Sequence, residues 1–326
     1  MKYRIILLLA AVLGLTLTAC REETTPTTAA TTAVETIVPA AVPVVTMEET
    51  METIEETTQP TETAAEIAAP PESAPVLQPE PADEDFVAVM DYIPDILVDL
   101  KYATQDNFTG QVIYEFEDVY LRYGMVKKLA AVQEELKDMG LGLKIWDGFR
   151  PVTAQFKLWE VCPDPTYVAN PETGYSNHNR GSAVDVTLVD SQGKELEMPT
   201  GFDDFSALAD RDYSDCNETA TANAMLLQNT MEAHGMSGYF GEWWHFNNDN
   251  RYTPEEDFQP VHKTWYYADC NEYINLRIEA DAASESLTQI PAGEEFLMLA
   301  KCGDFALVDY NGLKGYVHIG YIQSVQ

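Results

Sequence analysis

Two short segments constrain what this chain can fold into more than any other feature of its sequence. One covers residues 176–185 and contains His178 and Asp185; the other covers residues 242–245 and ends at His245. Two imidazoles and one carboxylate suit zinc best among the common metal ions. A catalytic zinc site takes three protein ligands and leaves a fourth position for water. The sequence therefore predicts a fold in which both segments meet around one zinc ion.

The first segment needs a turn to bring its two ligands together. A fully extended chain would place His178 and Asp185 ~23 Å apart, too far to share an ion, but Gly181 allows the backbone to reverse. Asp185 lies between two valines in a run that alternates like a strand, so an unpaired carboxylate there would be costly. A metal ion would satisfy it, and so would Arg180 or another structural salt bridge.

The second segment supplies a carboxylate that need not bind the metal. Glu242 and His245 are i and i+3, and on a helical turn they would face the same side. Glu242 could then take a proton from the attacking water, while Trp243 and Trp244 shield the site and lower its local dielectric. An ordinary surface pair on a helix would show the same spacing.

Arg150 is the next candidate, in the sequence Asp-Gly-Phe-Arg-Pro at residues 147–151. It follows a predicted strand, where functional loops often lie, and its guanidinium could stabilise an anionic tetrahedral intermediate. An ion pair with an acidic neighbour would explain the arginine equally well in so acidic a chain.

The first twenty residues predict a secretion signal. Lys2 and Arg4 precede an apolar run over residues 5–17, which is too short for a membrane span of ~20 residues. The run ends in Leu-Thr-Ala-Cys, which resembles a bacterial lipoprotein signal with Cys20 as the lipidated cysteine; a plain cleaved signal is the alternative. We therefore expect an exported protein, lipid-anchored on the outer side of the cytoplasmic membrane, in the periplasm or at the cell surface.

Residues 21–85 predict a disordered linker. This stretch has no aromatic residue, glycine or lysine and carries 15 acidic residues against one arginine, so it cannot bury enough apolar area to order itself. The net charge of the whole chain is −35, which argues against nucleic acid or an anionic membrane surface as a partner.

The four cysteines beyond the signal could form disulfides in an exported chain. Their positions suggest one pair in each of two domains, Cys162 with Cys216 and Cys270 with Cys302, although sequence alone does not choose the connectivity. None has the CxxC spacing of a thiolate zinc site.

Periodicity predicts a catalytic domain of mixed helices and strands over residues 86–258. Residues 91–102 predict a buried strand and its approach, and residues 141–146 and 183–189 predict two further strands. The predicted helices cover residues 125–139, 151–160 and 220–234. Gly140 and Gly235 stand where a glycine commonly ends a helix.

After Pro260, closely spaced strand patterns predict a small all-β barrel over residues 264–326. The strand candidates cover residues 274–277, 296–300, 305–310 and 315–318. Asn311-Gly312 predicts a hairpin turn, because both residues tolerate positive φ. Asn-Leu-Arg at residues 275–277 and Gly-Tyr-Val-His at residues 315–318 resemble signatures of bacterial SH3 domains, which implies a module that binds cell-wall peptides.

The motifs SxHxxGxAxD at residues 176–185 and ExWH at residues 242–245 resemble those of the zinc D-Ala-D-Ala metallopeptidases. The resemblance is closest to the D-alanyl-D-alanine dipeptidases, the group that contains the vancomycin-resistance dipeptidases. Residues 99–110 are similar to that group's N-terminal signature, and residues 147–151 match its Asp-Gly-aromatic-Arg-Pro segment. The resemblance covers about residues 88–250 and implies an α+β fold: a small antiparallel sheet flanked by helices, with one zinc ion at the sheet.

The resemblance also implies a role for each main site residue. His178, Asp185 and His245 would bind zinc. Glu242 would act as the general base and later pass its proton to the leaving amine, and Arg150 would stabilise the oxyanion.

Two substrate-binding residues follow from the same resemblance. Ser176 occupies the family's Ser-x-His position and would help to bind substrate. The family's Met-Gly-Thr-x-Phe-Asp segment appears here as Met-Pro-Thr-Gly-Phe-Asp at residues 198–203, so Asp203 would meet the substrate ammonium only if the altered segment keeps that contact.

The expected activity is zinc-dependent hydrolysis of D-alanyl-D-alanine outside the membrane. If the ammonium contact is altered, the enzyme could instead trim peptidoglycan stem peptides as a D,D-carboxypeptidase. A non-catalytic wall-binding lipoprotein is the third possibility, although every catalytic position of the family is filled here.

Overall fold

The structure is a computed structural model that describes residues 78–165, 167–250 and 252–325. The predicted signal, its Cys20 and most of the predicted linker lie outside the described residues. Among the helices that the structure describes, none has the length and apolar character needed to cross a membrane.

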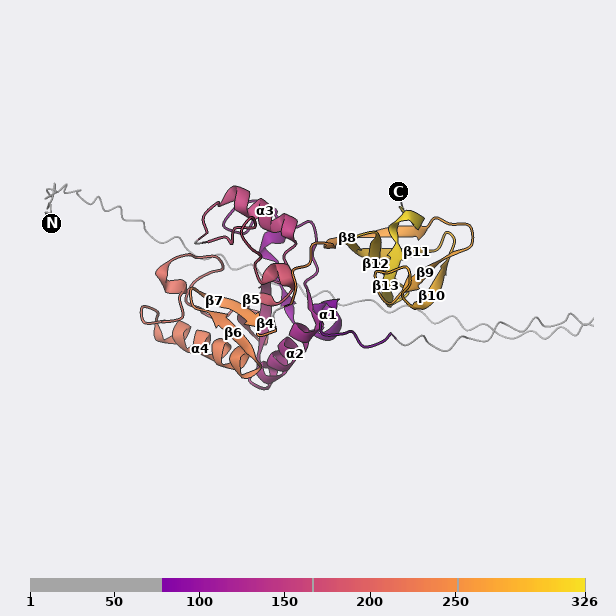
Figure 1. The fold of residues 1–326 in the computed structure, drawn as a ribbon. Helices are drawn as coiled ribbons and strands as arrows, with labels where there is room; N and C mark the ends of the chain where they lie inside the picture. Colours follow the sequence, from indigo (N-terminus) through magenta and orange to yellow (C-terminus); the bar gives the residue numbers. More distant parts are fainter. Residues whose placement is uncertain (1–77, 166, 251, 326) are drawn as a thin grey trace, which may run out of the picture. The chain divides into compact units, whose positions relative to one another are not determined.

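The catalytic part of the chain is built on a five-stranded sheet with the strand order β2-β4-β5-β7-β6 (Figure 1). All neighbours run antiparallel except β2, which runs parallel to β4. The strands are β2 (Leu97–Val98), β4 (Leu141–Asp147), β5 (Ala183–Asp190), β6 (Met236–Tyr239) and β7 (Glu242–Asn248). With the helices described next, this sheet confirms the predicted α+β class.

Two long helices pack against this sheet. α2 (Tyr123–Asp138) contacts β4, and α4 (Glu218–Ala233) contacts β5, β6 and β7. Because apolar residues at helical spacing share one face, burying that face against the sheet stabilises the helix. The stripe predicted from the sequence is fully buried on α2 and consists of Met125, Leu129, Val132 and Leu136.

The ends of these helices follow from local sequence. Gly140 and Gly235 come just after α2 and α4 with φ of 73° and 74°, the left-handed region that glycine adopts without strain. Asn217 caps the start of α4, since its side-chain oxygen accepts hydrogen bonds from the backbone N–H groups of Thr219 and Ala220.

Within residues 91–102, where a buried strand and its approach were predicted, the strand is only two residues long. The chain forms the short helix α1 (Val89–Tyr92), pairs only at β2, and then makes a 3-10 turn at Lys101–Ala103. Pro94 lies between α1 and β2 and has no N–H to donate to a ladder. The apolar side chain of Ile96, which favoured a strand, is buried, but Ile96 lies directly after the turn that contains this proline and before β2.

The remaining elements of this part are small. β1 (Phe86–Ala88) and β3 (Tyr120–Arg122) form a separate antiparallel pair. α3 (Val152–Val161) begins directly after Pro151, as predicted. Two further 3-10 turns lie at His178–Arg180 and Ala207–Ala209.

The C-terminal part is an antiparallel seven-stranded sheet in the order β10-β9-β13-β12-β11-β8-β14, which confirms the predicted all-β module. Asn311 and Gly312 turn the chain between β12 and β13 with φ of 55° and 84°. A last 3-10 turn lies at Ile319–Tyr321. The strands are β8 (Phe258–Ala268), β9 (Tyr273–Arg277), β10 (Ser286–Pro291), β11 (Glu295–Cys302), β12 (Phe305–Tyr310), β13 (Leu313–His318) and β14 (Ile322–Ser324).

The suggested disulfides are wrong, because Cys162, Cys216, Cys270 and Cys302 are all free thiols. The strand register explains the second pair. Cys302 pairs with Phe258 at one end of the β8–β11 ladder, whereas Cys270 follows the opposite end of β8. The two cysteines are therefore separated by about the length of β11, ~23 Å, whereas a disulfide needs Cα atoms within about 7 Å.

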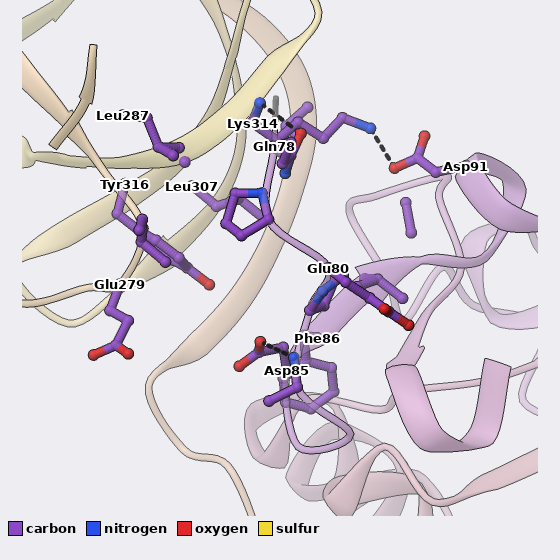
Figure 2. A pocket seen from close by; sticks show the side chains of 18 of the residues that line it. Gln78, Glu80, Asp85, Phe86, Asp91, Glu279, Leu287, Leu307, Lys314 and Tyr316 are labelled. Carbon is purple, nitrogen blue, oxygen red and sulfur yellow. Dashed lines mark hydrogen bonds and ion pairs between the residues drawn. The ribbon is translucent and has the colours of Figure 1, made fainter. Parts of the chain in front are cut away.

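A pocket of about 840 Å³ lies beside the segment that leads into β1 (Figure 2). Leu307 and Tyr316 of the C-terminal sheet line it together with residues 78–82, and Lys314 forms an ion pair with Asp91 at its edge. None of the predicted site residues lines this pocket, so it is separate from the candidate metal centre.

Candidate metal centre and active site

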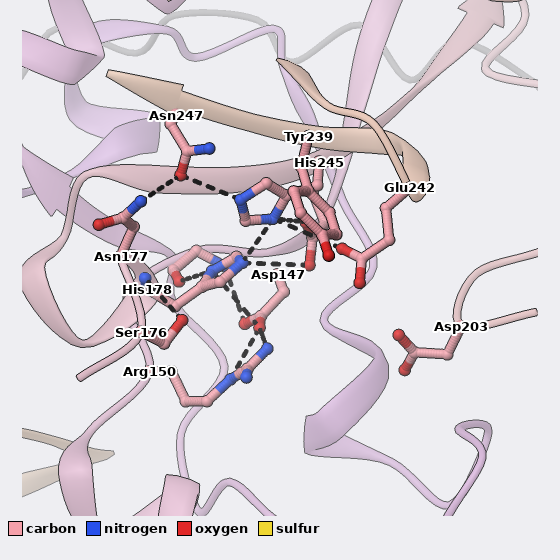
Figure 3. A network of polar contacts seen from close by, with 12 residues as sticks. Asp147, Arg150, Ser176, Asn177, His178, Asp203, Tyr239, Glu242, His245 and Asn247 are labelled. Carbon is pink, nitrogen blue, oxygen red and sulfur yellow. Dashed lines mark hydrogen bonds and ion pairs between the residues drawn. The ribbon is translucent and has the colours of Figure 1, made fainter. Parts of the chain in front are cut away.

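His178, Asp185 and His245 come together in the structure, and the two imidazoles face each other in Figure 3. His178 Nε2 lies 3.2 Å from His245 Nδ1, and Asp185 Oδ1 lies 2.9 Å from the same His245 nitrogen. The second Asp185 oxygen lies 3.4 Å from His178 Nε2. One ligand atom from each residue can therefore face a single ion.

The sheet register places two of these ligands side by side. Asp185 on β5 is the direct cross-strand partner of His245 on β7, and on its other side it pairs with Asp147 on β4. Direct antiparallel partners have Cβ atoms about 4.5–5.5 Å apart on one face. The three side chains therefore form a row across the sheet.

His178 reaches this row from the tight turn before β5. The turn His178–Arg180 ends at Gly181, whose φ is 65°. A Cβ on Gly181 would lie 2.4 Å from Cε1 of Phe86, so a side chain there would be both strained and in collision. The predicted reversal at Gly181 is confirmed.

The outward nitrogen of each imidazole is held by an oxygen atom. His178 Nδ1 donates to the Gly148 carbonyl at 2.7 Å, and His245 Nε2 donates to Asn247 Oδ1 at 3.0 Å. Asn177 Nδ2 donates to the same Asn247 oxygen at 2.7 Å. Because these outward nitrogens carry the ring protons, His178 Nε2 and His245 Nδ1 are left as the metal-binding atoms.

The chemistry of this donor set fits zinc. Two unprotonated nitrogens at 3.2 Å would repel each other without a cation, whereas tetrahedral zinc with bonds of about 2.0–2.1 Å would hold them at nearly this separation. Burial alone would raise the pKa of Asp185, but the charge of His178 and hydrogen bonds from both imidazoles outweigh it and hold the pKa below its ordinary value. The Asp185 carboxylate is therefore ionised, as a metal ligand needs to be.

Glu242 lies beside these residues, but the backbone conformation that places it there differs from the predicted one. Its Oε2 is 3.8 Å from His245 Nδ1, but both residues lie on strand β7, so the predicted helical turn is wrong. Residues three apart on a regular strand point to opposite faces. Here Gly238 pairs with Phe246, and the next residue, Tyr239, pairs with Glu242. This bulge in β7 turns Glu242 back to the face of His245.

The bulge also explains two consecutive buried tryptophans. Trp243 and Trp244 are each 1% exposed, which a regular alternating strand with one solvated face would not allow. Burial raises the pKa of Glu242 above its ordinary range, and the charge of Asp185 adds to this effect. Glu242 is thus a carboxylate that holds a proton more readily than usual, next to the candidate metal ligands.

Arg150 is buried and ion-paired, and in Figure 3 its guanidinium points toward the cluster. Its Nη2 lies 2.5 Å from Asp147 Oδ2, and its Nη1 donates to Gln155 Oε1 at 3.0 Å. Tyr114 OH donates to the other Asp147 oxygen at 2.7 Å. Asp147 lies 3.7 Å from His178 Nδ1, so this arginine is connected to the metal ligands through one carboxylate. The predicted ion pair with an acidic neighbour and a position at the site are therefore both present.

Ser176 lies at the start of the His178 turn. Its hydroxyl oxygen accepts a hydrogen bond from the His178 backbone N–H at 3.2 Å. In Figure 3 the side chain lies near the His178 ring and Arg150.

Asp203 faces the site from the side opposite the imidazoles, beyond Glu242 in Figure 3. Its Oδ2 accepts a hydrogen bond from Tyr102 OH at 2.7 Å, and its φ is 52°. Burial raises the pKa of the Asp203 carboxyl well above its ordinary value, and the charges of Asp185 and Glu242 contribute. No ion pair among the described residues includes this carboxylate.

Residues 82–263, more than half of the chain, match the family model described as D-ala-D-ala dipeptidase. The chain belongs to the D-Ala-D-Ala dipeptidase family. Residues 272–323 of this dipeptidase-family enzyme match the bacterial SH3 domain model.

Several curated relatives carry the name D-alanyl-D-alanine dipeptidase. The Escherichia coli (strain K12) protein is 40% identical over 153 residues, 47% of this chain and 79% of that protein. The Streptomyces coelicolor protein is 31% identical over 53% of this chain and 96% of its own length. The Enterococcus faecium protein is 34% identical over 45% of this chain and 83% of its own length. A solved structure of the vancomycin-resistance D,D-pentapeptidase VanY with Zn(II) is 14% identical with a TM-score of 0.28, over 40% of this chain and 74% of its own.

Sequence reasoning about this dipeptidase-family site missed the groups that orient its main residues. Asp147 belonged to a quoted motif but received no role, and Tyr114 and Gln155 carried no local signal. Asn247 was also not among the predicted site residues. It follows His245 by two residues, and on a strand that spacing places both side chains on the same face, which could have identified it.

None of the other three histidines belongs to the candidate metal centre. His234 ends α4 and its Nε2 lies 2.7 Å from Glu135 Oε2. His262 lies 3.5 Å from Glu117, and His318 is in β13.

Proposed function

We propose that this chain is a zinc-dependent D,D-dipeptidase that hydrolyses D-alanyl-D-alanine. The observation that carries the proposal is the convergence of the ligand atoms of His178, Asp185 and His245 toward one point, with Glu242 beside them. Catalytic zinc sites of peptidases combine three such ligands with one nearby carboxylate.

Each residue then has a role set by its position. A zinc ion held by the three ligands would supply a Lewis acid and bring the pKa of water near 7. Glu242 takes the proton of the attacking water and returns it to the leaving amine. Arg150 hydrogen-bonds the oxyanion of the tetrahedral intermediate. Asp147 and Gln155 fix its guanidinium beforehand, so little reorganisation is needed during the reaction.

Asp203 favours a dipeptide over a longer substrate. Its carboxyl group lies on the opposite side of the site from the imidazoles, and no ion pair among the described residues includes it, as would be expected of a receptor for a free ammonium group. D-Ala-D-Ala carries an ammonium group on the residue directly before the scissile bond. In a stem pentapeptide the same nitrogen belongs to an uncharged peptide bond. Tyr102 orients the carboxylate through its hydroxyl.

The decisive experiment compares the wild-type chain with Glu242→Gln, both loaded with zinc. We expect D-Ala-D-Ala turnover that stops with a chelator, returns with zinc and falls about 10²–10⁴-fold in the variant. Unchanged turnover in a zinc-loaded Glu242→Gln variant would reject the mechanism. Absence of any peptide turnover would favour a non-catalytic wall-binding protein.

Assay of a stem pentapeptide that ends in D-Ala-D-Ala separates the two enzymatic possibilities. A dipeptidase cleaves only the free dipeptide. Cleavage of the stem alone would make the protein a D,D-carboxypeptidase and would remove the proposed role of Asp203.

We also propose that the enzyme acts outside the cytoplasmic membrane. The signal-like segment ending at Cys20 would attach it by lipid, and the SH3 module at residues 272–323 would bind wall peptides. Fractionation of cells that express wild type or Cys20→Ala tests the anchor: the variant should leave the membrane fraction. A pull-down of residues 1–326 on purified wall tests the second partner, and failure to bind would remove it.

A further inference from the structure

Arg211 crosses the hairpin that carries Glu242 and His245. Its Nε donates to the Tyr239 carbonyl at 2.9 Å. Its Nη2 donates to the carbonyls of Trp243 at 3.0 Å and His245 at 2.9 Å. The backbone N–H of Arg211 donates to the Phe240 carbonyl at 2.9 Å. One residue thus binds four carbonyls of a single hairpin.

These carbonyls belong to the bulged part of the hairpin. Between the pairs Gly238–Phe246 and Tyr239–Glu242, residues 243–245 of β7 have no partner on β6. A bulge interrupts the ladder, and buried backbone carbonyls left without a partner are costly. The guanidinium replaces the missing strand partners for two of these three residues.

The space for this guanidinium is built into the hairpin. A Cβ on Gly238 would lie 2.3 Å from Arg211 Cζ, so a larger residue at that position would displace the guanidinium. The same Cζ lies 4.4 Å from the centre of the Phe246 ring, within cation–π distance. No ion pair among the described residues includes Arg211, and its side chain hydrogen-bonds Tyr213 in addition to the three carbonyls of this hairpin.

We propose that Arg211 is a positioning residue, which by binding the Trp243 and His245 carbonyls holds the β7 bulge that turns Glu242 toward the metal centre. The expected effect on kcat rests on the proposed function, whereas the effect on the β7 backbone does not. Without these bonds, β7 would lose the register that places Glu242 and His245 on one face, although both side chains would remain.

Lys128 provides a matched control, because it binds the opposite end of the same hairpin. Its Nζ donates to the Gly235 carbonyl and, at 2.7 Å, to Asn248 Oδ1. Arg211→Lys and Arg211→Gln are compared with Lys128→Met in the full chain. Lysine keeps the charge of Arg211 but cannot reach three carbonyls with a planar fork.

Two measurements are made on each variant that remains folded. In the metal-free protein, hydrogen exchange of the backbone amides of residues 242–246 should be faster in both Arg211 variants and unchanged in Lys128→Met. In the zinc-loaded enzyme, kcat for D-Ala-D-Ala should fall about 10–100-fold in the Arg211 variants with a much smaller change in KM, because a misplaced base costs the chemical step. Lys128→Met should keep kcat within about twofold, the scatter expected of an uninvolved residue.

Gly238→Ala is a second variant that keeps Arg211 but displaces its guanidinium, and it should give the same loss of kcat and the same faster exchange. The proposal is overturned if zinc-loaded Arg211 variants keep the kcat of Lys128→Met, or if exchange at residues 242–246 does not change. If the wild-type chain itself cleaves no D-Ala-D-Ala, the proposed function fails, while the exchange measurement still decides the role of Arg211.

Discussion

Asp185 and His245 are direct cross-strand partners on β5 and β7, and Asp185 Oδ1 lies 2.9 Å from His245 Nδ1. Burial alone would lower the pKa of His245. The hydrogen bond and charge of Asp185, with the charge of Glu242, outweigh burial and raise that pKa above its ordinary value. The same carboxylate that would bind the metal therefore retains a proton on the neighbouring ligand when the metal is absent.

This relationship predicts how zinc affinity depends on pH. Zinc needs the deprotonated His245 Nδ1, so binding releases a proton, and affinity should rise about tenfold per pH unit until the pH passes the raised pKa. In the metal-free protein, protonation of His245 stabilises the fold below its unfolded pKa of about 6.5, and this contribution is lost as the pH rises through the folded pKa. Zinc titrations between about pH 5 and 8 would contradict the prediction if the affinity were constant.

Asn247 should control zinc affinity although it binds no metal. Its side-chain oxygen holds the outward His245 Nε2–H, so Asn247→Ala should weaken zinc binding about 10–100-fold by releasing the ring. Zinc competition with a chromophoric chelator measures the change. Asn250→Ala, at an exposed position of the same polar run, is the control and should bind zinc like wild type.

Asp203→Asn should raise KM for D-Ala-D-Ala about 10–100-fold, since it removes the charge that would receive the substrate ammonium while keeping the shape and the hydrogen-bond acceptor for Tyr102. Steady-state kinetics on the zinc-loaded enzyme gives the value. The neighbouring exposed Asp204→Asn should leave KM unchanged. An unchanged KM in Asp203→Asn would show that the ammonium binds elsewhere.

Gly181→Ala should destabilise the fold by about 2–4 kcal/mol, because the left-handed backbone and the collision with Phe86 both oppose a methyl group. Chemical denaturation of the metal-free protein measures the loss. Gly201→Ala is the control, since an added Cβ there meets no atom within 4 Å and the backbone is not left-handed. Equal stability of the two variants would show that the turn before β5 tolerates a side chain.

Local sequence was sufficient wherever the structural cause is local. The apolar stripe of α2 and the glycines after α2 and α4 depend on residues within a few positions, and each lies where the sequence indicated. The segment before β4 shows the limit. Ile96 has the hydrophobicity of a strand residue, but Pro94 interrupts the pairing, and the apolar side chain is buried from a turn instead.

The sequence by itself determined which residues would meet at the site, because the family motifs contain the three candidate ligands, the nearby carboxylate and the arginine. Only the tertiary structure decided how they face one another. Spacing alone does not distinguish a helical turn from a bulged strand between Glu242 and His245, since the difference lies in the pairing of β7 with β6 and in Arg211, which is remote in sequence. Side-chain direction on a strand follows from its register with neighbouring strands, and register is a non-local property of the folded chain.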